Sequence, residues 1–314
     1  MKYQNVLVTG GAGFIGSYVV ERLVKEKYNV TVIDDLSAGD IKNIEHLKEK
    51  IEFIAADIRD EDILQKVCSG KDTIFHFAAD PNVKDSVSNP EKSFYINVQG
   101  TFRILECMRR LDVSNIVFAS SGGTLYGQVD VFPTPENMQF RPISAYGATK
   151  AVAEVYLSAY AASYGINAVS LRYANIFGPR STHGVMFDFY NKLKKDAKKL
   201  EILGDGKQIK SYLYITDCID ASFIAVKKGL VKGFDGFNIG TDSWTTVNEI
   251  ADIITNELDL QKVKYTYTGG EAGWTGDVFK MLLSIEKIKK LGWKPKVSTE
   301  EGIRLYIRWL KEQY

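Results

Sequence analysis

The sequence predicts an α/β fold, in which a doubly wound parallel sheet of the Rossmann type is joined to a smaller mixed α/β lobe. A glycine-rich turn lies between an apolar strand and a helix close to the N-terminus. Apolar strands then alternate with helices through the first half of the chain, which is the pattern of a parallel sheet covered on both faces. After Gly178 the alternation gives way to mixed segments, so we expect the second lobe to begin there.

The composition is that of a globular protein with balanced charge. The chain has 40 basic and 39 acidic residues, so neither nucleic acid nor an anionic membrane surface is expected as a main partner. Its 314 residues can bury a large core, and no apolar stretch has the length of a membrane span. Cys68, Cys107 and Cys218 lie far apart and the three histidines do not cluster, so we expect reduced thiols, no metal site and a cytoplasmic protein.

The glycine-rich turn follows the first apolar strand. Gly10 allows the tight turn, Gly13 lets backbone N–H groups approach a pyrophosphate, and Gly16 lets the helix pack closely on the strand. The helix start offers unpaired N–H groups and a positive dipole end to the anion, and we expect Phe14 and Ile15 to border it. The turn therefore predicts a dinucleotide site.

An acidic residue ends the second strand. Asp34 follows the apolar residues 29–33, about twenty residues beyond the glycine turn, where a carboxylate holds the ribose hydroxyls of the adenosine. Its charge would repel a 2′-phosphate. The sequence therefore predicts NAD rather than NADP.

Two further strands, residues 51–56 and 73–79, end at the same edge of the sheet. Asp57 either accepts a hydrogen bond from the adenine amino group there or caps the next turn. The small alanines at the end of the second strand leave room for a cofactor to pass closely. We expect these neighbours to line it: Ile58, Phe77, Ala78 and Ala79.

Asn97 lies in a helical stretch, residues 94–110, beside an apolar stripe. Its amide can satisfy backbone groups of a neighbouring strand. We expect this structural role to shape the cofactor site, and we count Asn97 among the cofactor-binding residues.

Candidate catalytic groups follow the strand of residues 115–119. Ser121 and Thr124 come at its carboxyl end, where the nicotinamide should lie. Farther on, Tyr146 and Lys150 are four residues apart and share one helix face. We expect the ammonium to lower the tyrosine pKa from about 10 toward neutrality. Such a phenolate can take a proton from a substrate hydroxyl while hydride leaves the same carbon.

Several motifs together resemble the extended short-chain dehydrogenases/reductases, and within them the NAD-dependent epimerase/dehydratase family. The chain is most similar to the UDP-glucose (UDP-galactose) 4-epimerases, over nearly its whole length. The resemblance rests on Asp34 and on these segments: residues 9–16, 97–101, 120–127, 146–150, 171–180, 204–206, 212–217, 238–240 and 291–295.

The resemblance implies that NAD stays tightly bound while one sugar carbon is inverted. Tyr146 would take the proton of the sugar 4-hydroxyl while NAD accepts hydride from C4, and Lys150 would also hold the nicotinamide ribose. A 4-keto sugar would then turn over in the pocket and take the hydride back on its other face. The family also implies a UDP-sugar substrate, a homodimer, and a cofactor contact at Tyr173.

The family expects a serine or threonine that hydrogen-bonds the same sugar hydroxyl. Counting forward from the strand selects Ser121, whereas counting back from Tyr126 selects Gly122, which has no hydroxyl. We expect Ser121 to serve, with Thr124 as the alternative. Related dehydratases and decarboxylases carry an acid where this chain has Gly123 and Thr124, so the loop argues against both reactions.

The resemblance also divides the chain into two parts. Residues 1–178, with about 212–240 returning, would bind NAD, and residues 179–211 and 241–314 would bind the sugar nucleotide.

Several residues of the second part are implied substrate contacts. Asn175 would lie near the diphosphate or the sugar, the strand with Leu200 against uracil, and Lys210 at the diphosphate. Many relatives have a diphosphate-binding arginine before residues 276–277, and this chain has none there, so Lys210 and Arg180 are expected to supply that charge.

Two residues near the end of the chain leave alternatives open. Asp277 either binds the uridine ribose or caps a turn, and Met281 either limits bulk at the sugar C2 or packs in the core. The preferred function is interconversion of UDP-glucose and UDP-galactose. The alternatives are epimerisation of UDP-glucuronate or UDP-N-acetylhexosamine, a dehydrogenase that releases NADH, and a non-catalytic NAD-binding protein of the same fold.

Overall fold

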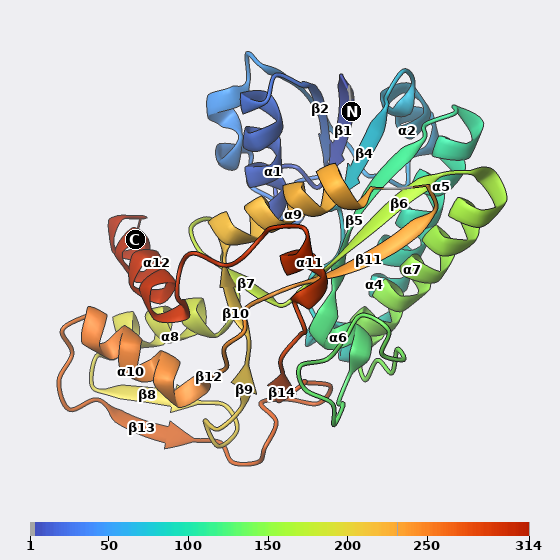
Figure 1. Cartoon of the computed structure of the whole chain (residues 1–314). Helices are drawn as coiled ribbons and strands as arrows, with labels where there is room; N and C mark the ends of the chain where they lie inside the picture. The colour runs from blue at the N-terminus through green and yellow to red at the C-terminus, as the bar shows by residue number, and fades with distance from the viewer. Residues whose placement is uncertain (1–3, 231, 314) are drawn as a thin grey trace.

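The computed structural model describes residues 4–230 and 232–313, and its centre is a seven-stranded parallel sheet (Figure 1). The strand order is β11-β6-β5-β4-β1-β2-β3, and it reverses between β1 and β4, where a doubly wound sheet opens a crevice for a ligand. The predicted Rossmann-type fold is therefore confirmed. The strands are β1 (Asn5–Thr9), β2 (Asn29–Asp34), β3 (Ile51–Ala55), β4 (Thr73–His76), β5 (Asn115–Ser121), β6 (Asn167–Tyr173) and β11 (Phe234–Ile239).

Helices cover both faces of this sheet (Figure 1). Val6 and Val8 of β1 point into one apolar core and Leu7 into the other, so the strand is buried on both sides. The first core lies under α1 (Phe14–Lys25) and α9 (Ile215–Gly229). The second lies under α2 (Glu61–Cys68), α5 (Gly100–Arg110) and α7 (Ala145–Tyr164). Shorter helices lie between these elements: η1 (Ile41–Asn43), η2 (Glu45–Leu47), α3 (Asp85–Ser88), α4 (Pro90–Ser93), η3 (Phe94–Gln99) and α6 (Gly122–Tyr126).

Small sheets and helices form the rest of the structure, at the lower left of Figure 1 and along the carboxyl edge of the main sheet. β7 pairs with β10, β8 with β13, and β9 with both β12 and β14. The division into two lobes stays a prediction. The elements are β7 (Asn175–Phe177), α8 (Val185–Lys195), β8 (Lys199–Ile202), β9 (Ile209–Lys210), β10 (Tyr212–Tyr214), β12 (Thr245–Thr246), α10 (Val247–Glu257), β13 (Lys264–Tyr267), β14 (Lys280–Met281), α11 (Glu286–Lys290) and α12 (Thr299–Gln313).

The carboxyl end of β4 differs from the sequence prediction. The strand ends at His76, three residues before the predicted end at residue 79. The Ala78 N–H bonds to the Thr9 hydroxyl at 3.2 Å instead of to a ladder carbonyl, so a side chain replaces the strand pairing here. The segment after β4 therefore leaves the sheet early and enters the crevice.

Candidate active site

A cavity of about 1160 Å³ opens at the carboxyl ends of the central strands. Its walls come from the glycine turn, from the segments after β4 and β5, and from the small sheets. Most of the predicted site residues line it, and Asn97 and Leu200 lie behind its wall. The predicted residues in the wall are Gly10, Gly13, Phe14, Ile15, Gly16, Asp34, Asp57, Ile58, Phe77, Ala78, Ala79, Ser121, Thr124, Tyr146, Lys150, Tyr173, Asn175, Arg180, Lys210, Asp277 and Met281.

The glycine turn fits the diphosphate of a dinucleotide. Gly10 has a φ of +69°, and a Cβ added there would lie 2.5 Å from the Ala78 backbone nitrogen. A Cβ on Gly16 would overlap the Gly10 carbonyl oxygen, so α1 can approach the turn only because this side chain is missing. Gly13 gives α1 no side-chain cap, and the first N–H groups of the helix are therefore available to an anion.

Gly16→Ala is expected to lower the free energy of unfolding by about 1–3 kcal/mol and to weaken NAD retention, because the added methyl group overlaps the Gly10 carbonyl. Gly13→Ala is the matched control, since its methyl group would meet the same oxygen at 3.2 Å. We expect the control to weaken NAD binding with a smaller change in unfolding. Urea unfolding and the NAD content of the purified proteins measure the two effects, and equal unfolding free energies would contradict this reading of Gly16.

The two acidic residues at the adenosine end have different local partners. The Asp34 carboxylate accepts hydrogen bonds from the Ala12 and Leu36 N–H groups, both at 2.9 Å, and burial raises its pKa. Asp57 accepts from the Arg59 backbone N–H at 2.8 Å and from its guanidinium, whose hydrogen bonds lower the pKa of this carboxyl. Asp57 thus has the turn-capping contact that the sequence left as one alternative, while it also lines the cavity.

Asn97 shapes the site without lining it, which corrects the expectation of a cofactor contact. Its amide oxygen accepts from the Asp80 N–H at 2.8 Å, and its Nδ2 donates to the Asp80 carbonyl at 3.3 Å and to the Thr149 hydroxyl at 3.1 Å. The residue is buried. Asn97 therefore ties the segment after β4 to α7 and satisfies backbone groups, as its amide predicts.

The start of α7 is fixed by two serines. The Ser144 hydroxyl accepts from the Gly147 N–H at 3.2 Å and so caps the helix. The Ser86 hydroxyl accepts from the Tyr146 N–H at 3.0 Å. Tyr146 is thus held in the first turn of a long helix, and its half-buried side chain lines the pocket.

The two hydroxyl candidates after β5 form a chain that leads to Tyr146. Ser121 hydrogen-bonds the Tyr146 side chain, and the Thr124 hydroxyl donates to Ser121 Oγ at 2.8 Å. Ser121 is the last residue of β5, and Thr124 lies in α6, a short helix that forms where the sequence suggests an open loop. Ser121 is therefore the direct neighbour of the phenol, and Thr124 is one step removed.

Burial dominates the acidity of both Tyr146 and Lys150. It raises the pKa of Tyr146 to about 12, and the hydrogen bond to Ser121 acts in the opposite direction. Burial also lowers the pKa of Lys150 to about 8. The Lys150 ammonium donates to the Ala119 carbonyl at 2.9 Å and lies 5.7 Å from the centre of the Tyr146 ring. The predicted lowering of the tyrosine pKa is therefore wrong for this pocket, because desolvation of the phenol is the largest effect on its pKa and Asp80 raises the pKa further.

A buried ion pair supports the helix beneath Lys150. Glu154 lies one turn further along α7, and its Oε2 is 2.7 Å from Arg172 Nη2 of β6. It also accepts from the Ser170 hydroxyl at 2.7 Å, and Arg172 donates to the Tyr126 hydroxyl at 2.8 Å. The Glu154 charge raises the pKa of Lys150 against the effect of burial. Sequence reasoning missed this pair, although Glu154 continues the four-residue spacing of Tyr146 and Lys150.

The two cations expected at the substrate diphosphate are both paired with carboxylates. Lys210 Nζ lies 2.6 Å from Asp277 Oδ1, with the Trp274 ring 5.5 Å away. The Arg180 guanidinium pairs with Glu21 of α1. An incoming diphosphate therefore competes with, or adds to, existing ion pairs.

Of the other predicted substrate contacts, one is buried in the core and two line the cavity. Leu200 is fully buried in the core of the small sheets, which corrects its assignment to the uracil contact; Leu203 lines the cavity instead. Asn175 lines the cavity and donates to the Ser211 carbonyl at 3.0 Å. Met281 lines the cavity and packs in a small apolar cluster with Leu283, so it has the predicted packing role, and its effect on bulk at the sugar C2 stays a prediction.

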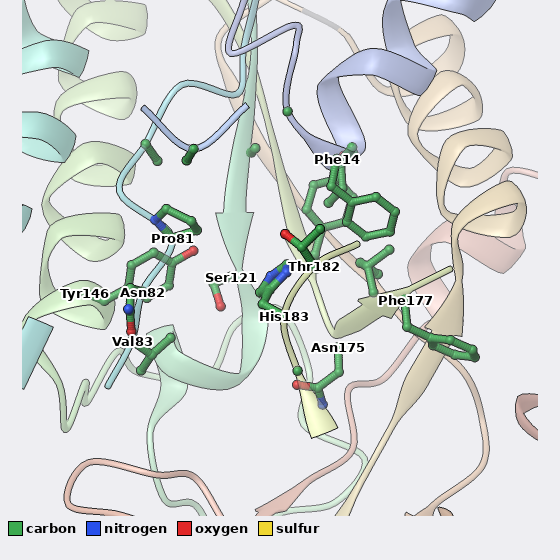
Figure 2. A pocket seen from close by; sticks show the side chains of 18 of the residues that line it. Phe14, Pro81, Asn82, Val83, Ser121, Tyr146, Asn175, Phe177, Thr182 and His183 are labelled. Carbon is green, nitrogen blue, oxygen red and sulfur yellow. The ribbon is translucent and has the colours of Figure 1, made fainter. Parts of the chain in front are cut away.

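The structure adds residues that the sequence prediction did not include. Figure 2 shows Asn82 and Val83, from the segment after β4, on the same side of the pocket as Tyr146, with Phe177 on the opposite side and His183 between them. Gln208 and Trp274 also line the cavity, and each has a buried polar atom without a hydrogen-bond partner among the described residues. The sequence did carry a general signal for these residues, because the loops that follow the carboxyl ends of parallel strands border the ligand in a doubly wound sheet.

Comparison with known proteins gives the same picture as the geometry. The model of the NAD dependent epimerase/dehydratase family matches residues 6–240. The chain belongs to this family. A putative UDP-glucose 4-epimerase of Methanocaldococcus jannaschii is 40% identical over 98% of each chain.

Two solved structures agree with the family assignment. The UDP-glucose 4-epimerase of Thermotoga maritima, solved with UDP-glucose, has a TM-score of 0.91 and 37% identity over 99% of each chain. A UDP-N-acetylglucosamine 4-epimerase from Methanobrevibacter ruminantium, in complex with UDP-N-acetylmuramic acid, has a TM-score of 0.90 and 30% identity over 100% of each chain. The protein is thus related to sugar-nucleotide epimerases and dehydratases, and NAD is its cofactor.

Two structural features bear on other partners. Within residues 4–230 and 232–313, none of the helices combines the length and the apolar character that a membrane span needs. The same residues contain no group of three or more His, Cys, Asp or Glu side chains placed to hold a metal ion.

Proposed function

We propose that this family member is a UDP-sugar 4-epimerase that interconverts UDP-glucose and UDP-galactose through a transient 4-keto sugar. The observation that carries the proposal is the Ser121–Tyr146 hydroxyl pair, which faces the same cavity as the dinucleotide turn. That cavity extends to Lys210 of β9 and to Asp277, in the segment before β14, so it has room for a second nucleotide. One cavity can therefore hold a nicotinamide and a sugar against one phenol.

Three residues in the cavity wall have different roles in the proposed reaction. Tyr146 takes the proton from the sugar 4-hydroxyl and returns it after the sugar has turned over. Ser121 bonds the same hydroxyl and passes the proton to the Tyr146 phenolate, and Lys150 keeps a positive charge close to that ring. The glycine turn and Asp34 would hold NAD, which would supply a reversible hydride acceptor. Its positive nicotinamide ring would favour the phenolate, which opposes the effect of burial on the Tyr146 pKa.

The position of Gly123 supports epimerisation over elimination. Gly123 and Thr124 line the cavity next to Ser121, where a dehydratase needs an acid. Among the described residues no glutamate lines the cavity. A Cβ on Gly123 would lie 3.3 Å from Met281 Cγ, so a larger acidic side chain would also meet the wall there.

The experiment that tests the proposal uses purified protein without added cofactor. The bound nucleotide is released and identified, and the protein is then given UDP-galactose while UDP-glucose is measured. Conversion at constant total NAD supports the epimerase cycle. Bound NAD without conversion, or net release of NADH, would rule out the proposed reaction.

The second candidate substrate is a UDP-N-acetylhexosamine. Met281 favours it, because a flexible side chain in the wall leaves room for a larger C2 group. UDP-N-acetylglucosamine and UDP-glucuronate should be assayed beside UDP-galactose. If all three fail while NAD is bound, a non-catalytic NAD-binding role becomes the better explanation.

Ser121→Ala is expected to lower kcat about 100-fold, because its hydroxyl contacts the phenol directly. Thr124→Ala should have a smaller effect, since its hydroxyl reaches only Ser121. The kcat for UDP-galactose measures both variants, with NAD content as a check on folding. A larger loss in Thr124→Ala would reverse the assignment.

We also propose that the protein is a homodimer that works in the cytoplasm. Phe94 and Tyr95 of η3 and Val155 of α7 are 53%, 44% and 62% exposed, and η3 packs along α7, so they form one apolar face. The three free, buried cysteines suit a reducing compartment. Val155→Glu should shift the protein to monomers in light scattering. An unchanged dimer would place the interface elsewhere, and a monomeric wild type would refute the dimer.

A further inference from the structure

The connection between β7 and α8, residues 178–184, is fastened to the first helix. The Arg180 guanidinium pairs with Glu21, donates to Ser17 Oγ at 3.1 Å and lies 4.3 Å from the centre of the Tyr18 ring. The Tyr18 hydroxyl donates to the Pro179 carbonyl at 3.4 Å. Because α1 begins at the glycine turn, these contacts hold the connection close to the dinucleotide site.

His183 lies on this connection and projects into the cavity. Figure 2 shows its imidazole pointing into the pocket, with Phe14 on one side and Ser121 on the other. Its ring packs edge-on against Phe14, the first residue of α1, with 6.5 Å between the ring centres and 82° between the planes. The imidazole therefore lies next to the N-terminus of α1, whose first N–H groups are available to bind an anion.

The hydrogen bonding of His183 leaves one ring nitrogen available. Ser181 Oγ lies 3.3 Å from Nδ1 and also 3.3 Å from the His183 carbonyl oxygen, and within the described part of the chain no hydrogen bond reaches Nε2. The residue is exposed toward the open cavity, and the protein around it still lowers the pKa of the imidazole, so the ring is mostly neutral at pH 7 and carries one N–H. The Ser181 hydroxyl has one proton, and in the tautomer with the ring proton on Nε2 it donates that proton to Nδ1 instead of to the His183 carbonyl.

We propose that His183 Nε2–H donates a hydrogen bond to the diphosphate of the bound dinucleotide, on the side opposite the start of α1. The nearby cation cannot supply this contact freely, because Arg180 is already paired with Glu21. A neutral N–H can bond a phosphate oxygen without a counter-charge of its own. The connection of residues 178–184 thus slows the dissociation of NAD. The inference depends on the dinucleotide site alone and not on the identity of the sugar.

The test compares three variants of the full chain by the release of bound NAD after dilution. His183→Ala should release NAD about tenfold faster than wild type, since it loses a hydrogen bond to a charged group. His183→Gln should keep much of the retention, because its amide can put an N–H near the place of Nε2. Asn191→Ala, at an exposed position of α8 outside the cavity, is the control and should behave as wild type.

The contacted group is identified with fragments that displace NAD. ADP-ribose has the diphosphate but no nicotinamide, so His183→Ala should weaken it as much as NAD. AMP has a single phosphate and should be affected less. Unchanged binding of ADP-ribose with weaker NAD would place the contact at the nicotinamide and overturn the proposal. Weaker UDP binding with unchanged NAD would assign the imidazole to the substrate diphosphate and would also overturn it. No sugar is turned over, so these outcomes are independent of the epimerase assay.

Discussion

Tyr146→Phe is expected to lower kcat for conversion of UDP-galactose about a thousandfold, while the NAD content of the purified protein stays at the wild-type level. The change removes the phenolic oxygen that takes the proton of the sugar, and general base catalysis contributes about 10²–10⁴-fold. The phenol accepts no backbone bond that the fold needs, because Tyr146 is positioned through its own N–H by Ser86. The kcat at saturating substrate and the released nucleotide are the two measurements.

Tyr156→Phe is the matched control for this variant. Tyr156 lies on the same helix and is 40% exposed, outside the cavity. It should retain wild-type kcat. If Tyr146→Phe kept more than about a tenth of the activity, another group would have to take the proton, and Ser121 would be the first to examine.

Glu154→Gln is expected to lower the free energy of unfolding by about 3–5 kcal/mol, because it leaves the buried Arg172 guanidinium without its counter-charge. Adding Arg172→Gln to this variant should recover part of the loss, since the stranded charge is then gone. Glu300→Gln is the control: its pair with Arg304 is exposed on the surface, and the change should be below about 1 kcal/mol. Urea unfolding measures all three, and equal losses at Glu154 and Glu300 would contradict the role of burial.

The same variant should change the pH dependence of catalysis. The Glu154 charge raises the pKa of Lys150, which burial brings to about 8. Without that charge the pKa falls further, so Lys150 loses its proton at a lower pH. The alkaline fall in kcat should therefore begin at lower pH in Glu154→Gln than in wild type. If kcat fell at the same pH in both proteins, deprotonation of Lys150 would not be the cause of the alkaline fall in kcat.

The parts of the site that could be predicted depend on local rules. Gly10 and Gly16 are required by the backbone of one turn, and Asp34 follows from the next strand. Tyr146 and Lys150 share a face because they lie four residues apart on a helix. Such features need only the neighbouring residues in the chain, so the periodicity and the spacing were enough.

The parts that could not be predicted depend on contacts between distant segments. Asn97 faces Asp80 and Thr149 instead of the cavity, and Leu200 is enclosed by the small sheets. Arg180 is neutralised by Glu21, which lies 159 residues earlier in the chain. No pattern in the sequence shows that two such residues meet, because the pairing follows from how the helices pack.

The sequence by itself determined the parallel sheet, the dinucleotide turn and the tyrosine–lysine pair, since each is specified within a few tens of residues. Only the tertiary structure decided the acidity of that pair and the neighbour of its phenol. Burial by elements from across the chain raises the pKa of Tyr146 and lowers that of Lys150, and the fold brings Ser121 to the phenol. Desolvation is a property of the assembled pocket, so it cannot be read from the spacing of the two residues.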